Sequence, residues 1–433
     1  MSARIESWGR YPRAMQRALP LGYRDAGLPA AEGTLLPYGN GRSYGDSCLN
    51  DGGNVLCTRG LDRFMAFDAA SGVLRCEAGV LLSEILALCL PQGWFLPVSP
   101  GTKYVTVGGA IANDVHGKNH HVAGSFGSHV RAFELLRSDG ERRLCTPEEN
   151  PEWFAATIGG LGLTGLITWA EIQMKRVLGP WLATETYKFG GLDEFFALSS
   201  GSEGYHEYTM AWVDCVSTGE SLGRGLFTNA EHAPTPPGTA EPPAGRLAIP
   251  FTPPMSLVNG LSLKAFNWLY YHRQRTKLRR ALLHYDPVFY PLDGIRQWNR
   301  MYGPRGFLQH QCVIPPTEAR GGIEELLREI AASGQGSFLA VLKLFGDKPS
   351  PGMLSFPRPG ATLALDFPNA GEKTFRLLER LDAVVAATGG AVYPAKDARM
   401  SGKHFRRFFP AWERFQAYID PRFSSSFWRR VME

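Results

Sequence analysis

Cysteine is scarce in this chain and is scattered along it. The seven cysteines include no C-x-x-C pair, which argues against a structural zinc site and a disulfide framework and fits a reducing compartment. No run reaches the roughly 18 apolar residues that a membrane span needs. The first sixteen residues contain no apolar segment typical of a secretory signal. We therefore expect a protein that is cytoplasmic or peripheral to the inner membrane face.

A strong charge of one sign is also missing. The chain has 46 Lys and Arg residues against 41 Asp and Glu residues, a formal net charge of +5. No basic stripe is interleaved with stacking aromatic residues, so we expect no nucleic-acid partner. Hydrophobic residues make up 44% of the chain and charged residues 20%, as in an ordinary globular protein. A length of 433 residues is too great for one simple core and predicts two domains.

Glycine, by contrast, is concentrated in three stretches, at residues 39–45, 101–109 and 159–165. Glycine lets a backbone come close to another surface. The first stretch is expected between two strands, where successive backbone N–H groups can form a nest for a pyrophosphate; an ordinary hairpin turn is the alternative. It is neither a Walker A loop nor a Rossmann fingerprint. A large dinucleotide needs several close backbone approaches, so the three stretches together favour a dinucleotide cofactor.

Apolar periodicity predicts the regular elements. A helix is expected near residues 82–90, and strands at 132–137 and 163–172. Between residues 305 and 396 the pattern reads strand, helix, strand, strand, helix, strand, the order of a ferredoxin-like unit. Such an antiparallel sheet, with helices on one face, would offer its other face as a lid over a cofactor. We therefore expect an α+β fold.

Three other segments have an unusual composition. Eight prolines between residues 229 and 255 predict a mobile surface loop. Five Lys and Arg residues at 272–280 can rest on an anionic membrane surface, and a solvated helix face is the alternative. The tail at 401–433 is aromatic and basic, and we expect one or two helices that dock onto the first domain.

Histidines cluster after the second glycine stretch. His120 and His121 are expected to point apart on a strand, and neither they nor His129 have a carboxylate at a metal-ligand spacing. We therefore expect no metal site.

Longer strings carry a resemblance to a known family. They are PYGNGRSYGDSCLNDGG (37–53), PGTKYVTVGGAIANDVHGKNHHVAGSFGSHV (100–130), GGLGLTGLI (159–167), WNRMYGPRGFLQHQ (298–311) and YPAKDAR (393–399). The first three resemble the FAD domain of the vanillyl-alcohol-oxidase, or PCMH-type, flavoproteins. Together the five are most similar to the branch of bacterial decaprenylphosphoryl-β-D-ribose 2-oxidases. The resemblance covers nearly the whole chain.

This resemblance implies a domain organisation. Residues 1–179, completed by residues 391–433, would form a two-subdomain FAD-binding domain. Residues 180–390 would form an antiparallel-sheet substrate domain, or cap, with the ferredoxin-like order.

The resemblance also implies the FAD contacts. The pyrophosphate would lie against Tyr38, Gly39, Asn40, Gly41, Arg42, Ser43, Tyr44, Gly45 and Ser47. The ribityl chain and the isoalloxazine ring would lie against Gly101, Thr106, Gly108, Gly109, Asn113 and His116, with Ile167 near the adenine end or the ring and Tyr393 on the cap side. Many relatives tether FAD through a histidine at the position of Arg42. We therefore expect noncovalent FAD, and a tether through His116 is the alternative.

Lys396 corresponds to the active-site lysine of the family. When a hydride leaves a carbinol carbon, the hydroxyl proton must leave too, and Lys396, Tyr393 or His116 can accept it. A lysine near the ring can also stabilise charge on the reduced flavin. The alternative for Lys396 is a simple ion pair with Asp397 or with another acid.

Further residues are candidates for substrate contacts. Lys118 and Lys343 suit a phosphate or sugar hydroxyls, although Lys343 can instead lie on a solvent-exposed strand face. Gln309 and Gln311 share one strand face and suit hydroxyl recognition. Tyr44, Trp212 and Tyr290 can shape a sugar pocket, and a place in the core is the alternative for Trp212. Ala364 stands where the resembled branch has a pocket cysteine, which leaves the substrate open.

The expected reaction is the FAD-dependent oxidation of a secondary alcohol of a sugar to a ketone. The resemblance points to the 2-hydroxyl of a polyprenyl-phosphate-linked ribose, with a separate NAD(P)H-dependent reductase completing an epimerisation. The alternatives are an FAD enzyme of a free alditol, an aldonolactone or another glycoside, and a flavin-binding protein without turnover.

Overall fold

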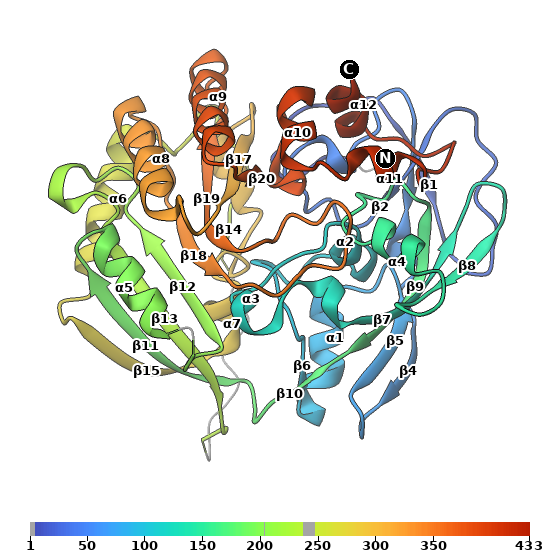
Figure 1. Ribbon diagram of the computed structural model, residues 1–433, viewed down its shortest axis with the longest axis horizontal. Coiled ribbons are helices and arrows are strands. Elements are labelled where there is room, and N and C mark those ends of the chain that lie inside the picture. Colours follow the sequence, from blue (N-terminus) through green and yellow to red (C-terminus); the bar gives the residue numbers. More distant parts are fainter. Residues whose placement is uncertain (1–4, 203, 237–246) are drawn as a thin grey trace.

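The computed structural model describes residues 5–202, 204–236 and 247–433, which form two lobes (Figure 1). The right-hand lobe in Figure 1 holds the N-terminal part of the chain and the C-terminal tail, and the left-hand lobe holds the middle of the chain. Helices and sheets occur in both, so the fold is α+β. No helix of the described part is long and apolar enough to cross a membrane.

The right-hand lobe contains two main sheets. Three strands pair in parallel in the order β1 (Arg17–Pro20), β3 (Asn54–Cys57), β2 (Leu35–Tyr38). Five strands pair antiparallel in the order β4 (Phe64–Asp68), β5 (Val73–Glu77), β9 (Leu166–Gln173), β7 (Val130–Leu136), β8 (Arg142–Cys145). The predicted strands at 132–137 and 163–172 are β7 and β9. Because β2 and β3 are parallel, the first glycine stretch between them is not a hairpin turn, and that alternative is wrong.

Short helices complete this lobe. The predicted helix near residues 82–90 is α1 (Leu82–Cys89), which buries Leu82, Ile85, Leu86 and Cys89 on one face. The others are α2 (Val107–Ala112), α3 (His120–Ala123) and α4 (Pro151–Thr157). His120 and His121 therefore begin a helical turn, and the expectation of a strand there is wrong.

The left-hand lobe is built on a single antiparallel sheet of eight strands. Their order is β15 (Leu278–His284), β11 (Trp181–Phe189), β13 (Gly225–Ala233), β12 (Tyr208–Val213), β18 (Val341–Phe345), β19 (Gly360–Pro368), β17 (Phe307–Ile314), β20 (Ala391–Val392). Helices α5 (Leu192–Ser202), α8 (Ala319–Ser333) and α9 (Glu372–Ala387) cover one face (Figure 1). The other face turns toward the right-hand lobe.

The sheet is wider than the sequence predicts. From residue 307 to 392 the chain order is β17, α8, β18, β19, α9, β20. β12 pairs with β18, which joins four further strands from residues 181–284 to the same sheet. The proline-rich segment 229–255 is not one loop, since its first five residues belong to β13. Leu247–Ala248 forms β14, paired with β16 (Ile295–Arg296), and residues 237–246 lie outside the described residues.

The tail forms three helices, α10 (Gly402–Phe408), α11 (Trp412–Gln416) and α12 (Ser426–Met432), rather than one or two. It docks on the right-hand lobe, where the backbone of Leu35 donates to Arg422 and accepts from Ser424. Phe405 and Trp428 pack edge to face in the core between α10 and α12. This brings the tail beside the residues of the first glycine stretch.

Candidate active site

A large cavity lies between the lobes. Its volume is about 1240 Å³, larger than the roughly 300–1,000 Å³ of a site for a drug-sized ligand. The first glycine stretch, α2 and β9 line one side, and residues of β11, β12, β13, β15, β17, β18 and β19 line the other. Because side chains two apart share one strand face, the inner face of the eight-stranded sheet, which carries polar and apolar residues, forms this second wall. The space is large enough for a dinucleotide and a substrate together.

Most of the residues singled out in the sequence meet at this cavity. From the expected FAD set these are Gly39, Asn40, Gly41, Arg42, Ser43, Tyr44, Ser47, Gly101, Thr106, Gly108, Gly109, Asn113, His116, Ile167 and Tyr393. From the expected substrate set these are Tyr44, Lys118, Trp212, Gln309, Gln311, Lys343, Ala364 and Lys396. The fold thus joins segments that lie more than 350 residues apart in the chain.

Three of the predicted residues lie behind the lining instead. The hydroxyl of Tyr38 donates to the carbonyl oxygen of Glu6 at 2.7 Å. Gly45 packs so tightly that a Cβ there would lie 1.7 Å from the carbonyl oxygen of Asp397. Tyr290 is almost fully buried, and its hydroxyl shares a hydrogen bond with Ser99. These residues support the walls and do not face the cavity.

The first glycine stretch folds as a cradle against α2. A Cβ at Gly39 would lie 2.3 Å from Oγ1 of Thr106, which itself accepts from the backbone N–H of Gly109 and caps α2. Gly41 has a φ of 59°, in the left-handed region. Ser47 lines the cavity, and its buried hydroxyl oxygen has no hydrogen-bond partner among the described residues. An unpaired buried hydroxyl of this kind suits a bound polar ligand.

Arg42 takes the position at which other flavoproteins carry a tether. Its guanidinium lies over the ring of Trp8, 4.3 Å from the ring centroid, and donates to the carbonyl oxygen of Asn40 at 2.7 Å. Burial lowers the pKa of Arg42. A guanidinium is no nucleophile, so this position offers no group for a covalent bond to a flavin.

His116 is the centre of a polar chain across the cavity. Nζ of Lys343 lies 3.0 Å from Nδ1 of His116 and also donates to the carbonyl oxygen of Gly117. On the other side, Nε2 of His116 lies 2.7 Å from the side-chain amide of Gln311. Burial, and then the charge of Lys343, hold the pKa of His116 well below its usual value. His116 is therefore a neutral imidazole, and Lys343 does not lie on a solvent-exposed face.

Lys396 stands at the same end of the cavity. Its Nζ lies 3.9 Å from the centroid of the Tyr44 ring. Burial lowers the pKa of Lys396 to about 8, and the charge of Asp366 opposes this shift. Asp397 is not its partner, because the Asp397 carboxylate accepts from Arg430 at 3.0 Å. The proposed pair of Lys396 with Asp397 is therefore not present.

Asp366 is a residue that the sequence reading missed. It lies on β19, almost fully buried, and accepts a hydrogen bond from Nε2 of Gln309 at 2.6 Å. Burial raises the pKa of Asp366 to about 7. The available signal was a single carboxylate in the otherwise apolar strand ATLALDFP, where a charge needs a reason.

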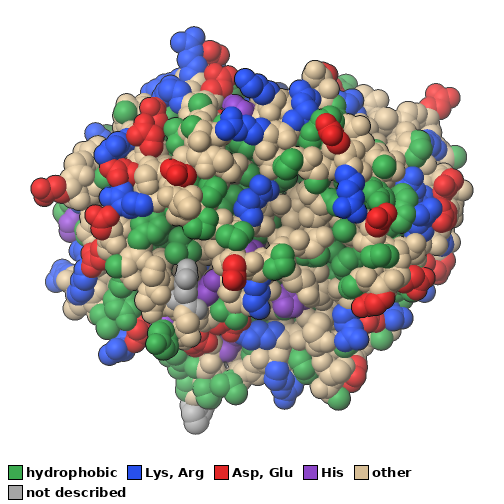
Figure 2. Space-filling view, viewed as in Figure 1, with side chains coloured by type: hydrophobic (Ala, Val, Ile, Leu, Met, Phe, Trp, Pro, Cys, Tyr) green, Lys and Arg blue, Asp and Glu red, His purple; other side chains and the backbone are tan. Residues whose placement is uncertain are grey.

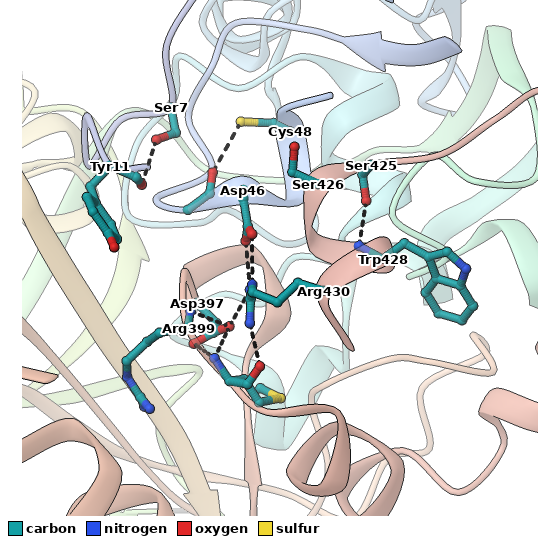
Figure 3. Close-up of polar contacts among 12 residues, drawn as sticks. Ser7, Tyr11, Asp46, Cys48, Asp397, Arg399, Ser425, Ser426, Trp428 and Arg430 are labelled. Carbon is teal, nitrogen blue, oxygen red and sulfur yellow. Dashed lines mark hydrogen bonds and ion pairs between the residues drawn. The ribbon is translucent and has the colours of Figure 1, made fainter. Parts of the chain in front are cut away.

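The tail supplies a second missed feature, the Arg430 clamp (Figure 3). Arg430 on α12 donates from Nε and Nη2 to the two carboxylate oxygens of Asp46, at 2.9 and 2.7 Å. Its Nη2 also donates to Asp397. The carboxylate of Asp397 in turn accepts from the backbone N–H groups of Arg399 and Met400. One side chain thus ties the end of the first glycine stretch to the segment that carries Lys396.

Besides Arg42, three arginines that the sequence did not single out individually line the cavity: Arg273, Arg279 and Arg296. No group of three or more His, Cys, Asp or Glu residues in the described part could hold a metal ion. His120 packs 4.5 Å from the ring of Phe345, and burial lowers its pKa to about 3.

Comparison with known proteins agrees with this geometry. Residues 28–146 match the family described as FAD binding domain. Decaprenylphosphoryl-beta-D-ribose oxidase of Mycolicibacterium smegmatis is 37% identical over 99% of this chain and 97% of its own length. The chain belongs to this family of FAD-dependent oxidoreductases. An uncharacterized protein of Streptomyces coelicolor is 35% identical over 81% of this chain and 100% of its own length.

Another relative matches a shorter part of the chain. Cytokinin dehydrogenase 8 of Oryza sativa subsp. indica is 32% identical over 36% of this chain and 32% of its own length. The family cofactor is FAD, and the residues present fit it, since the first glycine stretch packs closely on the start of α2 beside the cavity and Ser47 has an unpaired hydroxyl. When bound, FAD supplies the hydride acceptor.

Proposed function

We propose that this member of the family oxidises a secondary hydroxyl of a sugar to a ketone, with the 2-hydroxyl of a polyprenyl-phosphate-linked ribose as the leading substrate. One observation carries the proposal: a lysine of lowered pKa and the arginines Arg273, Arg279 and Arg296 line the same cavity. The first suits removal of a hydroxyl proton, and the second suits a phosphodiester. The similarity to the mycolicibacterial oxidase along nearly the whole chain supports the same substrate class.

Lys396 is the base in this proposal. With a pKa of about 8, the Lys396 amine is neutral in a minor fraction of the molecules at neutral pH, and the neutral amine can accept the hydroxyl proton as the carbinol hydride leaves. Tyr393 is a weaker candidate, because burial raises its pKa and its hydroxyl donates to the carbonyl oxygen of Asn113 at 2.7 Å. His116 is also a weaker candidate, because its pKa is held well below its usual value and both of its ring nitrogens are engaged, by Lys343 and Gln311.

The cofactor is proposed to be held without a covalent bond. The first glycine stretch would receive the pyrophosphate, with Ser47 as a hydrogen-bond donor. Arg42 offers no tether, and both ring nitrogens of His116 are already engaged, by Lys343 and Gln311. A covalent link through His116 would break one of these contacts.

Substrate contacts divide between two groups. Gln309 and Gln311 face the cavity on β17 near Lys396 and suit sugar hydroxyls. Lys118 donates to the carbonyl oxygen of Phe289 at 3.0 Å, and burial lowers its pKa to about 8. Arg279 makes no ion pair with a described acidic residue, so its charge is available for a phosphate. A free alditol needs no such group, which favours the lipid-linked sugar.

The remaining expectations are part of the same proposal. We infer an FAD domain of residues 1–179 and 391–433 and a cap of residues 180–390, with the order β17-α8-β18-β19-α9-β20 supporting a ferredoxin-like half of the cap sheet. A keto sugar must be reduced on the opposite face to give an epimer, so an NAD(P)H-dependent reductase is the proposed partner.

Anaerobic reduction of the flavin tests the proposal. Holoenzyme is mixed with a short-chain prenyl-phosphate ribose, with free ribose and with a free alditol, and the absorbance of oxidised flavin is followed. We expect bleaching by the prenyl-phosphate sugar alone. Bleaching by the alditol in preference would assign the alternative substrate class, and no bleaching by any sugar would refute the catalytic proposal.

A further inference from the structure

Helix α6 (Gly260–His272) is packed in an unusual way. Its buried side carries Leu263 and Asn267, and the amide of Asn267 donates to Asp214 at 3.0 Å. Its outer side carries Leu261, Trp268 and Leu269, whose side chains are 82%, 54% and 62% exposed, respectively. A surface helix normally does the reverse and turns its apolar stripe to the core. The outer side of α6 thus has the composition of a contact face.

The exposed apolar side chains continue into the segment before the helix. Leu247, Phe251, Met255 and Leu257 are all exposed. The hydroxyl of Ser262 on α6 donates to the carbonyl oxygen of Leu257, which fixes this segment to the start of the helix. Single exposed apolar residues are ordinary, but a run of them along one stretch of chain marks an interaction site.

The charges around this face have one sign. From residue 247 to 285 the chain contains no Asp or Glu, and it contains Lys264, Arg273, Arg275, Lys277, Arg279 and Arg280. Lys277 pairs with Glu194, and Arg280 with Glu185. The other four basic residues have no ion pair with a described acidic residue. By contrast, basic and acidic side chains are mixed over the face of the molecule shown in Figure 2.

The same surface borders the cavity. Tyr270 and Arg273 at the end of α6, and Arg279 and Leu283 on β15, belong to the lining. The apolar and basic surface is therefore continuous with the lining of the cavity that Lys396 also lines.

We propose that α6, the segment 247–259 and the basic residues 273–280 form a docking surface for an anionic lipid bilayer. This surface is called the α6 surface below. Apolar side chains flanked by lysines and arginines are the composition that inserts at the boundary between lipid headgroups and acyl chains. Only the biological role of this surface rests on the proposed function. In that role, the prenyl chain of the substrate stays in the bilayer while its sugar enters the cavity.

Vesicle flotation tests the α6 surface with the holoenzyme. One set of vesicles is phosphatidylcholine alone, and the other contains about 30 mol % phosphatidylglycerol, enough for a negative surface potential. We expect binding to the anionic vesicles only, and loss of most of it at about 0.5 M salt, where charges are screened. A Trp268→Ser/Leu269→Ser variant should bind at least about tenfold more weakly, because two apolar side chains no longer leave water.

A matched control distinguishes binding through the α6 surface from nonspecific adsorption through other exposed apolar residues. Met15 and Tyr205 are exposed apolar residues far from it in the sequence, with exposed fractions of 84% and 83%. A Met15→Ser/Tyr205→Ser variant should bind vesicles like the wild type. Equal binding by both double variants, or no binding to anionic vesicles, would overturn the proposal.

Two further outcomes are informative. If the Trp268→Ser/Leu269→Ser change converts a dimer to a monomer in analytical ultracentrifugation and leaves vesicle binding unchanged, the surface belongs to a second copy and the proposal is wrong. If the substrate proposal is wrong, the result differs from this one. A soluble prenyl-phosphate sugar would then bleach the flavin neither in the wild type nor in the Trp268→Ser/Leu269→Ser variant, while the wild type would still bind anionic vesicles.

Discussion

The Arg430 clamp predicts that one side chain of the tail controls how firmly the flavin site is held. Arg430→Gln removes the charged hydrogen bonds to Asp46 and Asp397 and leaves two buried carboxylates without their cation. Their side chains are only 4% and 3% exposed. Breaking a buried ion pair on one side costs about 3–5 kcal/mol. Since a quarter of the Arg430 side chain is exposed, we take the lower end, about 3 kcal/mol.

This loss of stability can be measured by the release of FAD on heating, which flavin fluorescence reports. At about 2–4 °C per kcal/mol for a domain of this size, the midpoint of release should fall by about 6–12 °C. Arg430→Lys keeps the charge without the two-pronged geometry and should lie between the wild type and Arg430→Gln.

The matched control is Arg414→Gln, on α11 of the same tail. Arg414 pairs with Glu152 at 3.5 Å, and both side chains are mostly exposed. Such a pair contributes about 0–1 kcal/mol, so its midpoint should stay close to that of the wild type. If Arg430→Gln releases its flavin within about 2 °C of Arg414→Gln, the clamp does not stabilise the site and the reasoning is refuted.

Three other outcomes are expected. The rate of anaerobic flavin reduction should rise with pH, reach half of its maximum near pH 8 and level off above that, because the neutral form of Lys396 is the base, and Lys396→Ala should keep its flavin but lose this reduction; a rate that falls as pH rises through 8 would instead assign the charged form. Gly39→Ala should purify with little flavin, because its Cβ would lie 2.3 Å from Thr106, whereas Gly27→Ala, with nothing within 4 Å, should keep it; equal flavin content would contradict the cradle. Acid precipitation should leave all flavin in the supernatant, and flavin in the pellet would show a covalent bond.

The sequence could predict the parts of the site that have local signatures. The glycine stretches, Thr106 and His116 each lie in a string whose composition already indicates a close backbone approach, and the structure brings them to one cavity. Lys396 also stood out, but only through the resemblance, because an isolated lysine has no local signature of catalysis.

The missed features depend on contacts that no local pattern encodes. Arg430 and Asp46 are 384 residues apart, and neither has a neighbour that suggests the other. Strands β11 and β13 were missed for another reason. Their inner positions include Thr184, Thr186 and Thr228, which face the cavity. A strand that turns polar residues to a cavity on its inner face lacks the clean alternation of apolar and polar residues by which strands are recognised.

Strand β15 has a consequence beyond the site. It is the outermost strand of the eight-stranded sheet and pairs on one side only, with β11, among the described residues. An exposed sheet edge offers unpaired N–H and C=O groups to the edge of another molecule, and charged side chains discourage that pairing. β15 carries Arg279 and Arg280 in succession. Arg279, which lines the cavity, and its neighbour Arg280 therefore also disfavour edge-to-edge pairing of this strand with another molecule.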